Sequence, residues 1–192
     1  MTDMKRFDTR KPGTALYPVP VALVTCIDES ERPNVITLAW VGVVCSEPPQ
    51  IGISVRPGRH SHPMIERTGQ FVAAIPSEDL LHATDFCGVV SGRNVDKFAE
   101  AGLTALPATR VKPPLIAECP VNIECLVRHK LSLGTHDLFI GEVVAVHVDQ
   151  AVLDEKGSID FAKARPIAYC GGEYWALGRL LERHGYSARK AR

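Results

Sequence analysis

The sequence has few aromatic residues and no excess of either charge. Aromatic side chains make up 6% of its 192 residues, and 22 Lys and Arg balance 22 Asp and Glu. No basic stripe runs between aromatic residues, and no net field attracts a polyanion, so we expect no nucleic-acid partner. No apolar run reaches the roughly 20 residues that cross a bilayer as a helix, so we expect no membrane partner.

The motifs of several catalytic classes are also missing. No strand-like run is followed by G-x-G-x-x-G, which argues against a Rossmann nicotinamide site. Residues 88–92 contain two glycines but not the Lys-Ser/Thr pair of a P-loop. Neither a G-x-S-x-G nucleophile elbow nor an H-E-x-x-H helix occurs. If the chain is an enzyme, we expect a bound cofactor to supply its chemistry.

The six cysteines form no C-x-x-C pair, and four lie in or beside apolar runs. We interpret them as reduced thiols that pack as small apolar side chains. The N-terminal segment is polar and shows no secretory signal, so we expect a cytoplasmic protein. Two alternatives stay open: a metal site at His60, His62 and Cys45, and a catalytic thiol at Cys87 or Cys119 with His82.

Apolar and β-branched runs predict a mainly β structure. Length and a 45% hydrophobic composition suit a single domain spanning residues 1–192. Strands are predicted at residues 19–27, 34–44, 50–55, 70–75, 121–131, 137–148 and 166–170. Helices are predicted at residues 63–67, 78–86, 94–101 and 173–184, with irregular chain at 104–120. Residues 1–14 are interpreted as an N-terminal arm and residues 185–192 as a mobile basic tail.

Most of these strands follow one another directly along the chain. Runs 19–27 and 34–44 are predicted to pair across a charged turn, and runs 121–131 and 137–148 form a second hairpin. Sequential strands with helices inserted late predict a closed antiparallel barrel rather than a parallel doubly wound sheet.

The loop after the third predicted strand concentrates groups that bind anions. Arg56, Arg59, His60 and Ser61 fall within six residues, and Gly58 allows a left-handed backbone. Guanidinium, imidazole and hydroxyl groups suit a phosphate, which suggests a phosphorylated cofactor. A solvated surface turn with ordinary arginines explains the same pattern.

Two further groups have plain structural interpretations. Asp96 and Lys97, on a short predicted helix, are by default a solvated pair of charges. Tyr169, Tyr174 and Trp175 are by default a packing cluster for the last helix.

Six stretches of the chain, in order, resemble one known family. They are YPVPVALVTC at 17–26, PNVITLAW at 33–40, CSEPPQIGISVRPGRHSH at 45–62, SGRNVDKF at 91–98, FIGEV at 139–143 and RPIAYCGGEYWALG at 165–178. The sequence resembles the flavin reductase-like family of FMN-binding split barrels, and within it the flavoredoxin branch. The resemblance implies an all-β or α+β fold, a six- to seven-stranded antiparallel Greek-key split β-barrel with a few short peripheral helices.

The resemblance also implies FMN as cofactor and a homodimer with the flavin close to the subunit interface. Residues 37–40 match the edge of the isoalloxazine ring, residues 54–56 run toward the ribityl chain and phosphate, and Lys97 lies near the phosphate. Arg59 and His62 correspond less securely, because this loop differs among family members. The implied cofactor-binding residues are Thr37, Leu38, Ala39, Trp40, Ser54, Val55, Arg56, His60, Ser61 and Lys97.

Two redox functions follow from the resemblance. The chain is expected to be an NAD(P)H:flavin oxidoreductase that takes hydride at the flavin, or a flavoredoxin-like carrier reduced by another redox protein. No catalytic side chain or metal ligand is assigned in either case. The alternatives are a non-redox barrel that binds another phosphorylated ligand or haem, and a dimeric module whose basic loop binds acidic partners.

Overall fold

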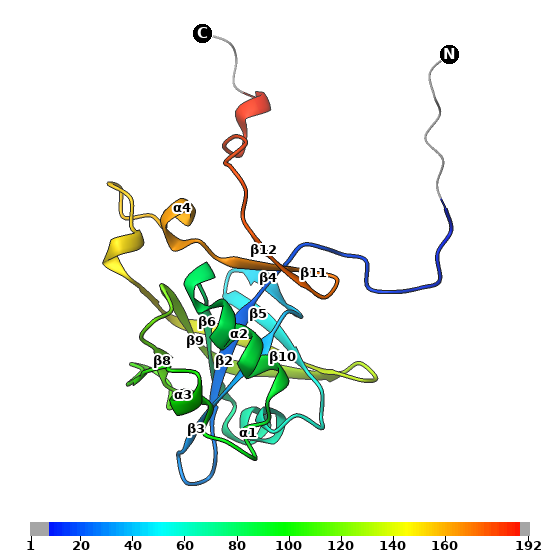
Figure 1. Ribbon diagram of the computed structural model, residues 1–192, viewed down its shortest axis with the longest axis vertical. Helices are drawn as coiled ribbons and strands as arrows, with labels where there is room; N and C mark the ends of the chain where they lie inside the picture. Colours follow the sequence, from blue (N-terminus) through cyan, green and yellow to red (C-terminus); the bar gives the residue numbers. More distant parts are fainter. Residues whose placement is uncertain (1–7, 189–192) are drawn as a thin grey trace.

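The computed structural model describes residues 8–188 and is organised around one antiparallel sheet (Figure 1). The seven strands lie in the order β3–β2–β6–β9–β10–β5–β4, and every neighbouring pair is antiparallel. They are β2 (Ala22–Ile27), β3 (Pro33–Leu38), β4 (Val41–Ser46), β5 (Pro49–Val55), β6 (Gln70–Ile75), β9 (Val121–Ser132) and β10 (Asp137–Val148).

The two edge strands of this sheet, β3 and β4, follow each other directly in the chain. Ala39 and Trp40 form the bend between them, and the Ser54 N–H donates to the Trp40 carbonyl at 2.9 Å. The predicted continuous strand at 34–44 is therefore wrong. At the bend the chain leaves its neighbour β2 and joins β5, so the sheet curls and its two edges meet at this corner.

The predicted strand at 19–27 is divided as well. Residues Val19–Pro20 form β1, which pairs with β11 (Ile167–Cys170) in a separate three-stranded sheet with β12 (Glu173–Ala176). The rest of the run is β2, which is buried at every position. That burial confirms the prediction of a strand covered on both faces.

Two apolar clusters explain why β2 is covered on both sides. Inside the barrel, Val24 packs with Ile53, Phe71 and Phe139. On the outer face, Leu23 packs against residues of the peripheral helices such as Phe98. The outer-face helices are α2 (Leu81–Val89) and α3 (Lys97–Glu100), whereas α1 (Ser61–Thr68) packs Met64 and Ile65 against the inner cluster. Helix α4 (Phe161–Ala164) lies farther along the chain. None of the helices in the described part of the chain is long and apolar enough to cross a membrane.

The irregular segment predicted at 104–120 contains only two two-residue strands, β7 (Ala105–Leu106) and β8 (Leu115–Ile116). The carboxylate of Glu124 on β9 is fully buried and holds this segment in place. It accepts hydrogen bonds from three backbone N–H groups of residues 109–111, from the Thr109 hydroxyl and from the ring of His147. A buried charge with this many donors is fully satisfied.

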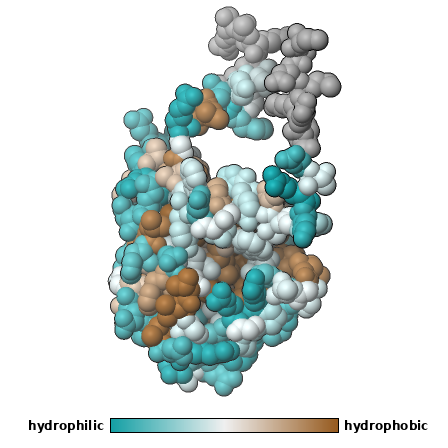
Figure 2. Space-filling view, turned by 45° about the vertical axis from the view of Figure 1, so that its right-hand side comes forward, coloured by the Kyte–Doolittle hydropathy of each residue, from teal (hydrophilic) through white to brown (hydrophobic). Residues whose placement is uncertain are grey.

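The predicted helix at 173–184 is wrong. Gly171 and Gly172 have φ of 60° and 108° and turn the chain so that β12 pairs with β11. Beyond Ala176 the chain has no regular structure until a single 3₁₀ turn at Tyr186–Ala188. Leu180 and Leu181 are 80% and 82% exposed, and this segment projects from the body (Figures 1 and 2).

The N-terminal arm is described only from Asp8 onward. Residues 8–14 are exposed and have no helix or strand. The remainder of the predicted arm, and the end of the predicted basic tail, lie outside the described residues.

Candidate functional site

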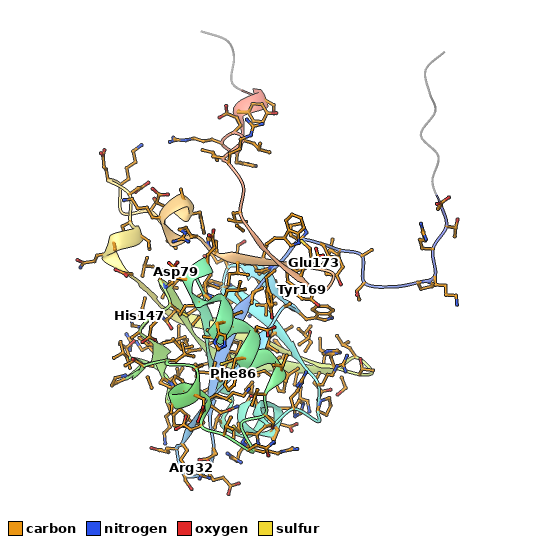
Figure 3. All side chains as sticks on the ribbon, viewed as in Figure 1. Arg32, Asp79, Phe86, His147, Tyr169 and Glu173 are labelled. Atoms are coloured by element: carbon orange, nitrogen blue, oxygen red, sulfur yellow. The ribbon has the colours of Figure 1, made fainter. Side chains whose placement is uncertain are left out.

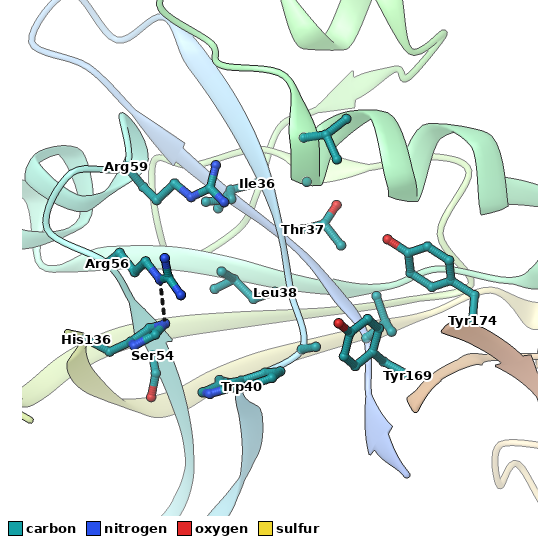
Figure 4. Close-up of a pocket in the computed structure, with 14 residues that line it drawn as sticks. Ile36, Thr37, Leu38, Trp40, Ser54, Arg56, Arg59, His136, Tyr169 and Tyr174 are labelled. Carbon is teal, nitrogen blue, oxygen red and sulfur yellow. Dashed lines mark hydrogen bonds between the residues drawn. The ribbon is translucent and has the colours of Figure 1, made fainter. Parts of the chain in front are cut away.

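A cavity of about 350 Å³ opens beside the corner where β3 turns into β4 (Figure 4). Strand β3 and the bend supply Ile36 to Trp40, and β5 with its following loop supplies Ser54, Arg56 and Arg59. The remaining walls come from segments distant in sequence: Val21, Gly88, Val89, His136, Tyr169 and Tyr174.

A smaller cavity of about 160 Å³ continues from the first. Both are lined by Ile36, Arg59 and Gly88. The smaller one is enclosed by the loop at 58–61, the segment at 90–92 and the side chains of Asn34 and Lys97. Together the two cavities form one groove along β3, which we call the β3 groove, wide at Trp40 and narrow at Asn34.

Lys97 provides a fixed positive charge at the narrow end. It is 5% exposed, and its Nζ donates to the carbonyls of Val35 at 2.9 Å and Cys87 at 2.7 Å. An ammonium has three N–H donors, so one remains for the groove. Burial, with a smaller contribution from the Arg59 charge, lowers the pKa of Lys97. The interpretation of Asp96 and Lys97 as a solvated pair is wrong, because Asp96 instead caps α3 through the N–H groups of Phe98 and Ala99.

The start of α1 faces the same cavity. No side chain caps this helix and its first turn has no acidic residue, so its N-terminal dipole favours an anion. The Ser61 hydroxyl accepts a hydrogen bond from the Asn34 amide at 2.7 Å. Burial first, and then the charges of Arg93 and Lys97, lower the pKa of His60. The imidazole is therefore a neutral group placed among cations.

Two glycines, one in the last turn of α2 and one just after the helix, allow this wall to approach β3. A Cβ on Gly92 would lie 2.0 Å from Oδ1 of Asn34, and one on Gly88 would lie 3.3 Å from Cβ of Thr37. The Thr37 hydroxyl donates to the Thr84 carbonyl at 2.5 Å and ties α2 to the strand. A Cβ at Gly92 would require Asn34 to shift, and one at Gly88 would require Thr37 to give by a few tenths of an ångström.

Arg56 and His136 meet across the wide end of the groove. The Arg56 Nε donates to His136 Nε2 at 3.4 Å (Figure 4). Burial first, and then the Arg56 charge, lower the pKa of His136, which leaves the imidazole free to accept this bond. The register of β10 on β5 explains this contact. Asp137 lies opposite Val55, so the residues just beyond this pair, His136 and Arg56, are brought together.

Three aromatic rings stand at the mouth of the wide end. The Tyr169 ring lies edge-on to Trp40 and Tyr174, with centroids 6.1 and 6.0 Å apart. Tyr174 donates to Asp85 at 3.2 Å, and burial together with that carboxylate raises its pKa to about 12. The interpretation of these tyrosines as packing for a last helix is wrong, because they sit on the β11–β12 hairpin and line the cavity.

Comparison with known proteins decides the family. The sequence model of the flavin reductase like domain matches residues 14–178. This chain belongs to the flavin reductase-like family. It is 34% identical over 167 residues to the protein YddH of Escherichia coli, covering 84% of this chain and 88% of that one.

Solved structures agree with this family assignment. Flavoredoxin of Desulfovibrio vulgaris (Miyazaki F) is similar with a TM-score of 0.90 and 35% identity, over 97% of this chain and 100% of that chain. Flavoredoxin from Methanosarcina acetivorans is similar with a TM-score of 0.86 and 27% identity, over 95% and 98%. The predicted family, its flavoredoxin-like character and the antiparallel split-barrel fold are confirmed.

The ten cofactor-binding residues that the sequence predicts fall into three groups. Six line the wide end of the β3 groove and three line the narrow end, while Val55 is fully buried in the barrel core and has only its backbone to offer. The first group is Thr37, Leu38, Ala39, Trp40, Ser54 and Arg56, and the second is His60, Ser61 and Lys97. Their assignment to FMN stays a prediction.

Arg59 and His62, the two loop residues whose match to the family was less secure, lie in different places. Arg59 lines both cavities. His62 lies outside the groove, buried with its Nε2 at 2.8 Å from the Asp137 carboxylate and its ring against Phe139. The sequence reasoning missed His136, Gly88 and the two tyrosines. A signal existed only for Gly88, which lies just before the SGRNVDKF stretch that contains Gly92.

Neither the metal site nor the catalytic thiol that the sequence left open is supported by the structure. His62 is committed to Asp137, and within residues 8–188 no three His, Cys, Asp or Glu side chains are grouped to hold a metal ion. Cys87 and Cys119 are buried. Burial raises the pKa of Cys87 to about 11 and also raises that of Cys119, so neither thiol ionises readily.

Proposed function

We propose that the chain, as a single domain, binds FMN in the β3 groove and passes reducing equivalents through it. The donor set at the narrow end carries this proposal. Lys97, Arg59, His60, Ser61 and the start of α1 all face the cavity of about 160 Å³, and none of its lining residues is acidic. A phosphate dianion is the ligand that such a set suits, because charged donors bind it strongly and specifically.

The strand itself supports the placement of the ring. As an edge strand, β3 bonds to β2 on one side only. The Val35 carbonyl faces the other side, where it accepts from Lys97. In an antiparallel ladder alternate residues share a side, so the N–H and C=O of Thr37 are directed the same way, toward the groove. A flat heterocycle with donors and acceptors along one edge would bind this free backbone.

Bound FMN supplies hydride or electron transfer that the protein side chains cannot. The residues of the chain hold and tune it. Arg56 brings positive charge to the wide end, which favours a reduced, anionic ring. Tyr169 and Tyr174 form an aromatic wall at the mouth, where a planar donor or acceptor would approach.

For the electron source we propose NAD(P)H. The test is to load the pure protein with FMN, exclude oxygen, and mix it with NADH or NADPH in a stopped-flow spectrometer. Rapid loss of the visible flavin absorbance is expected with at least one of them. If neither bleaches the flavin while dithionite does, the reductase activity is refuted and a carrier reduced by another protein takes its place. A colourless protein that does not take up FMN, or one with a haem band, would refute flavin binding itself.

We also propose a homodimer. Val43 and Val44 on the edge strand β4 are 79% and 51% exposed, and Leu180 and Leu181 project from the body. A second copy would cover these apolar side chains. Light scattering should give twice the 20.9 kDa chain mass, and a chain ending at Gly178 should dissociate more readily.

A further inference from the structure

The loop between β5 and α1, which carries donors of the narrow end, is held at both of its ends by the β9–β10 hairpin. At its start, the Arg56 Nε donates to Nε2 of His136. At its end, Nε2 of His62, in the first turn of α1, lies 2.8 Å from the carboxylate of Asp137. His136 and Asp137 are adjacent in the sequence. Two neighbouring residues of one hairpin therefore fix the loop at 56–62 on both sides.

The contact between His62 and Asp137 is buried and closely held. Both side chains are 7% exposed. Bonds from Lys130 first, and then from His62 and Ser132, lower the pKa of Asp137 to about 2. An ionised carboxylate only accepts hydrogen bonds, so Nε2 of His62 carries the hydrogen and donates it. The His62 ring also lies edge-on to Phe139, with the centroids 5.2 Å apart, so a bond and a packing contact together fix its orientation.

His62 does not itself reach the ligand site. It lines neither cavity of the β3 groove, whereas the two residues before it, His60 and Ser61, line the narrow end. Ser61 accepts a hydrogen bond from Asn34 of β3. The start of α1 is thus bonded to β3 through Ser61 and to β10 through His62, and these two strands are not neighbours in the sheet. The helix start spans the two strands, so its place against β3 depends on the bond to Asp137.

We infer that His62 and Asp137 are positioning residues for the phosphate end of the β3 groove. Their bond sets where the start of α1, with His60 and Ser61, stands relative to β3. The inference rests on the proposed binding of FMN with its phosphate at the narrow end. Donors have to be held within about 0.5 Å of their productive places to bind at full strength. Without the bond, α1 stays attached to the barrel core through Met64, but its first turn loses one of its two anchors.

The experiment titrates flavin-free protein with FMN and with riboflavin, which lacks the phosphate, and follows flavin fluorescence. The ratio of the two Kd values measures what the phosphate adds to binding. His62→Phe keeps an aromatic ring beside Phe139 and loses the donor, while His62→Gln keeps an N–H donor. The preference for FMN over riboflavin should fall about tenfold in His62→Phe, as for the loss of one charge-assisted contact, and stay within about threefold of wild type in His62→Gln.

His147→Phe is the matched control. His147 also bonds to a buried carboxylate, that of Glu124, and it lines neither cavity of the groove. It lies near the other end of β10, ten residues from Asp137 or roughly 30 Å along the strand (Figure 3). The control therefore loses a histidine–carboxylate bond of the same kind from the same strand. It should lower stability and leave the preference for FMN unchanged.

The outcomes separate this inference from the proposed function. Folded His62→Phe with the wild-type preference overturns the inference and leaves FMN binding standing. An equal loss in His147→Phe, or no recovery in His62→Gln, also overturns it, because general loosening then explains the effect. If His62→Phe does not fold, Asp137→Asn decides: it keeps the shape of the carboxylate without its charge, and should lower the preference at least about threefold. An unchanged preference in that variant overturns the inference. Wild-type protein that binds neither flavin, or both equally, refutes the proposed phosphate site and the inference with it.

Discussion

Lys97→Met tests the phosphate site most directly. Methionine has nearly the length of lysine but neither charge nor donors, so the substitution removes the third N–H of a buried ammonium and little volume. A hydrogen bond to a charged group contributes about 1.5–3 kcal/mol. Since about 1.4 kcal/mol is a factor of ten, the Kd for FMN should rise about tenfold to a hundredfold.

The same substitution also costs stability, and the assay has to separate the two effects. The carbonyls of Val35 and Cys87 lose their donor, at about 1–3 kcal/mol for each buried group left unpaired. Riboflavin has the ring of FMN without its phosphate. General loosening of the groove weakens both ligands, whereas loss of the phosphate contact weakens FMN alone. The quantity to measure is therefore the ratio of the two Kd values.

The assay is fluorescence titration of flavin-free protein at a temperature where circular dichroism shows the variant folded. Lys112→Met is the matched control, because Lys112 is an exposed lysine that lines none of the cavities. We expect the preference for FMN over riboflavin to fall at least about tenfold in Lys97→Met and to stay unchanged in the control. An unchanged preference in folded Lys97→Met would refute the placement of the phosphate at the narrow end of the groove.

Three other predictions test the loop, the buried carboxylate and the barrel interior. Arg56→Ala with His60→Ala should weaken FMN binding at least about tenfold in the same titration, and full affinity would contradict the role of this loop. Burial alone would raise the pKa of Glu124, but bonds from Thr109, His147 and Arg110 lower it to about 2. The ionised Glu124 carboxylate should contribute about 3 kcal/mol to the free energy of unfolding above pH 4.5, and this contribution should be lost toward pH 2. Glu124→Gln should therefore lower stability to urea at pH 7 far more than at pH 3. Gly141→Ala should lower the melting temperature, because its Cβ would lie 2.6 Å from Phe71, whereas Gly42→Ala has open space and should not.

The long strands were predictable because their signal is local. Strands β5, β6, β9 and β10 lie within about one residue of the predicted runs, since apolar side chains recur along each strand itself. The three predicted elements that the structure breaks, at residues 19–27, 34–44 and 173–184, are those in which the pairing partner decides rather than the local run. The segment at 173–184 has helical character, but the glycine turn before it and pairing with β11 make its first part a strand.

The site was predictable along β3 and β5 and much less elsewhere. Lys97 shows the difference: its residue type indicates a solvated charge, and only its position in the SGRNVDKF stretch indicated a phosphate. Its burial depends on a carbonyl 62 positions away in the sequence, at Val35. His136 has no local signal at all, because the register of β10 on β5 brings it to Arg56.

The position of the groove follows from how the barrel closes. An exposed edge strand is normally covered or charged, because its free N–H and C=O groups invite another strand. Here α2 and the segment at 88–92 stand over the edge of β3. This wall approaches the strand closely at Gly88 and Gly92, and the channel lies between the wall and the strand. If β3 bonded to β4 along its whole length, those backbone groups would be used up and the channel would be filled. The bend at Ala39 and Trp40, which prevents that pairing, is therefore the feature that makes room for a ligand.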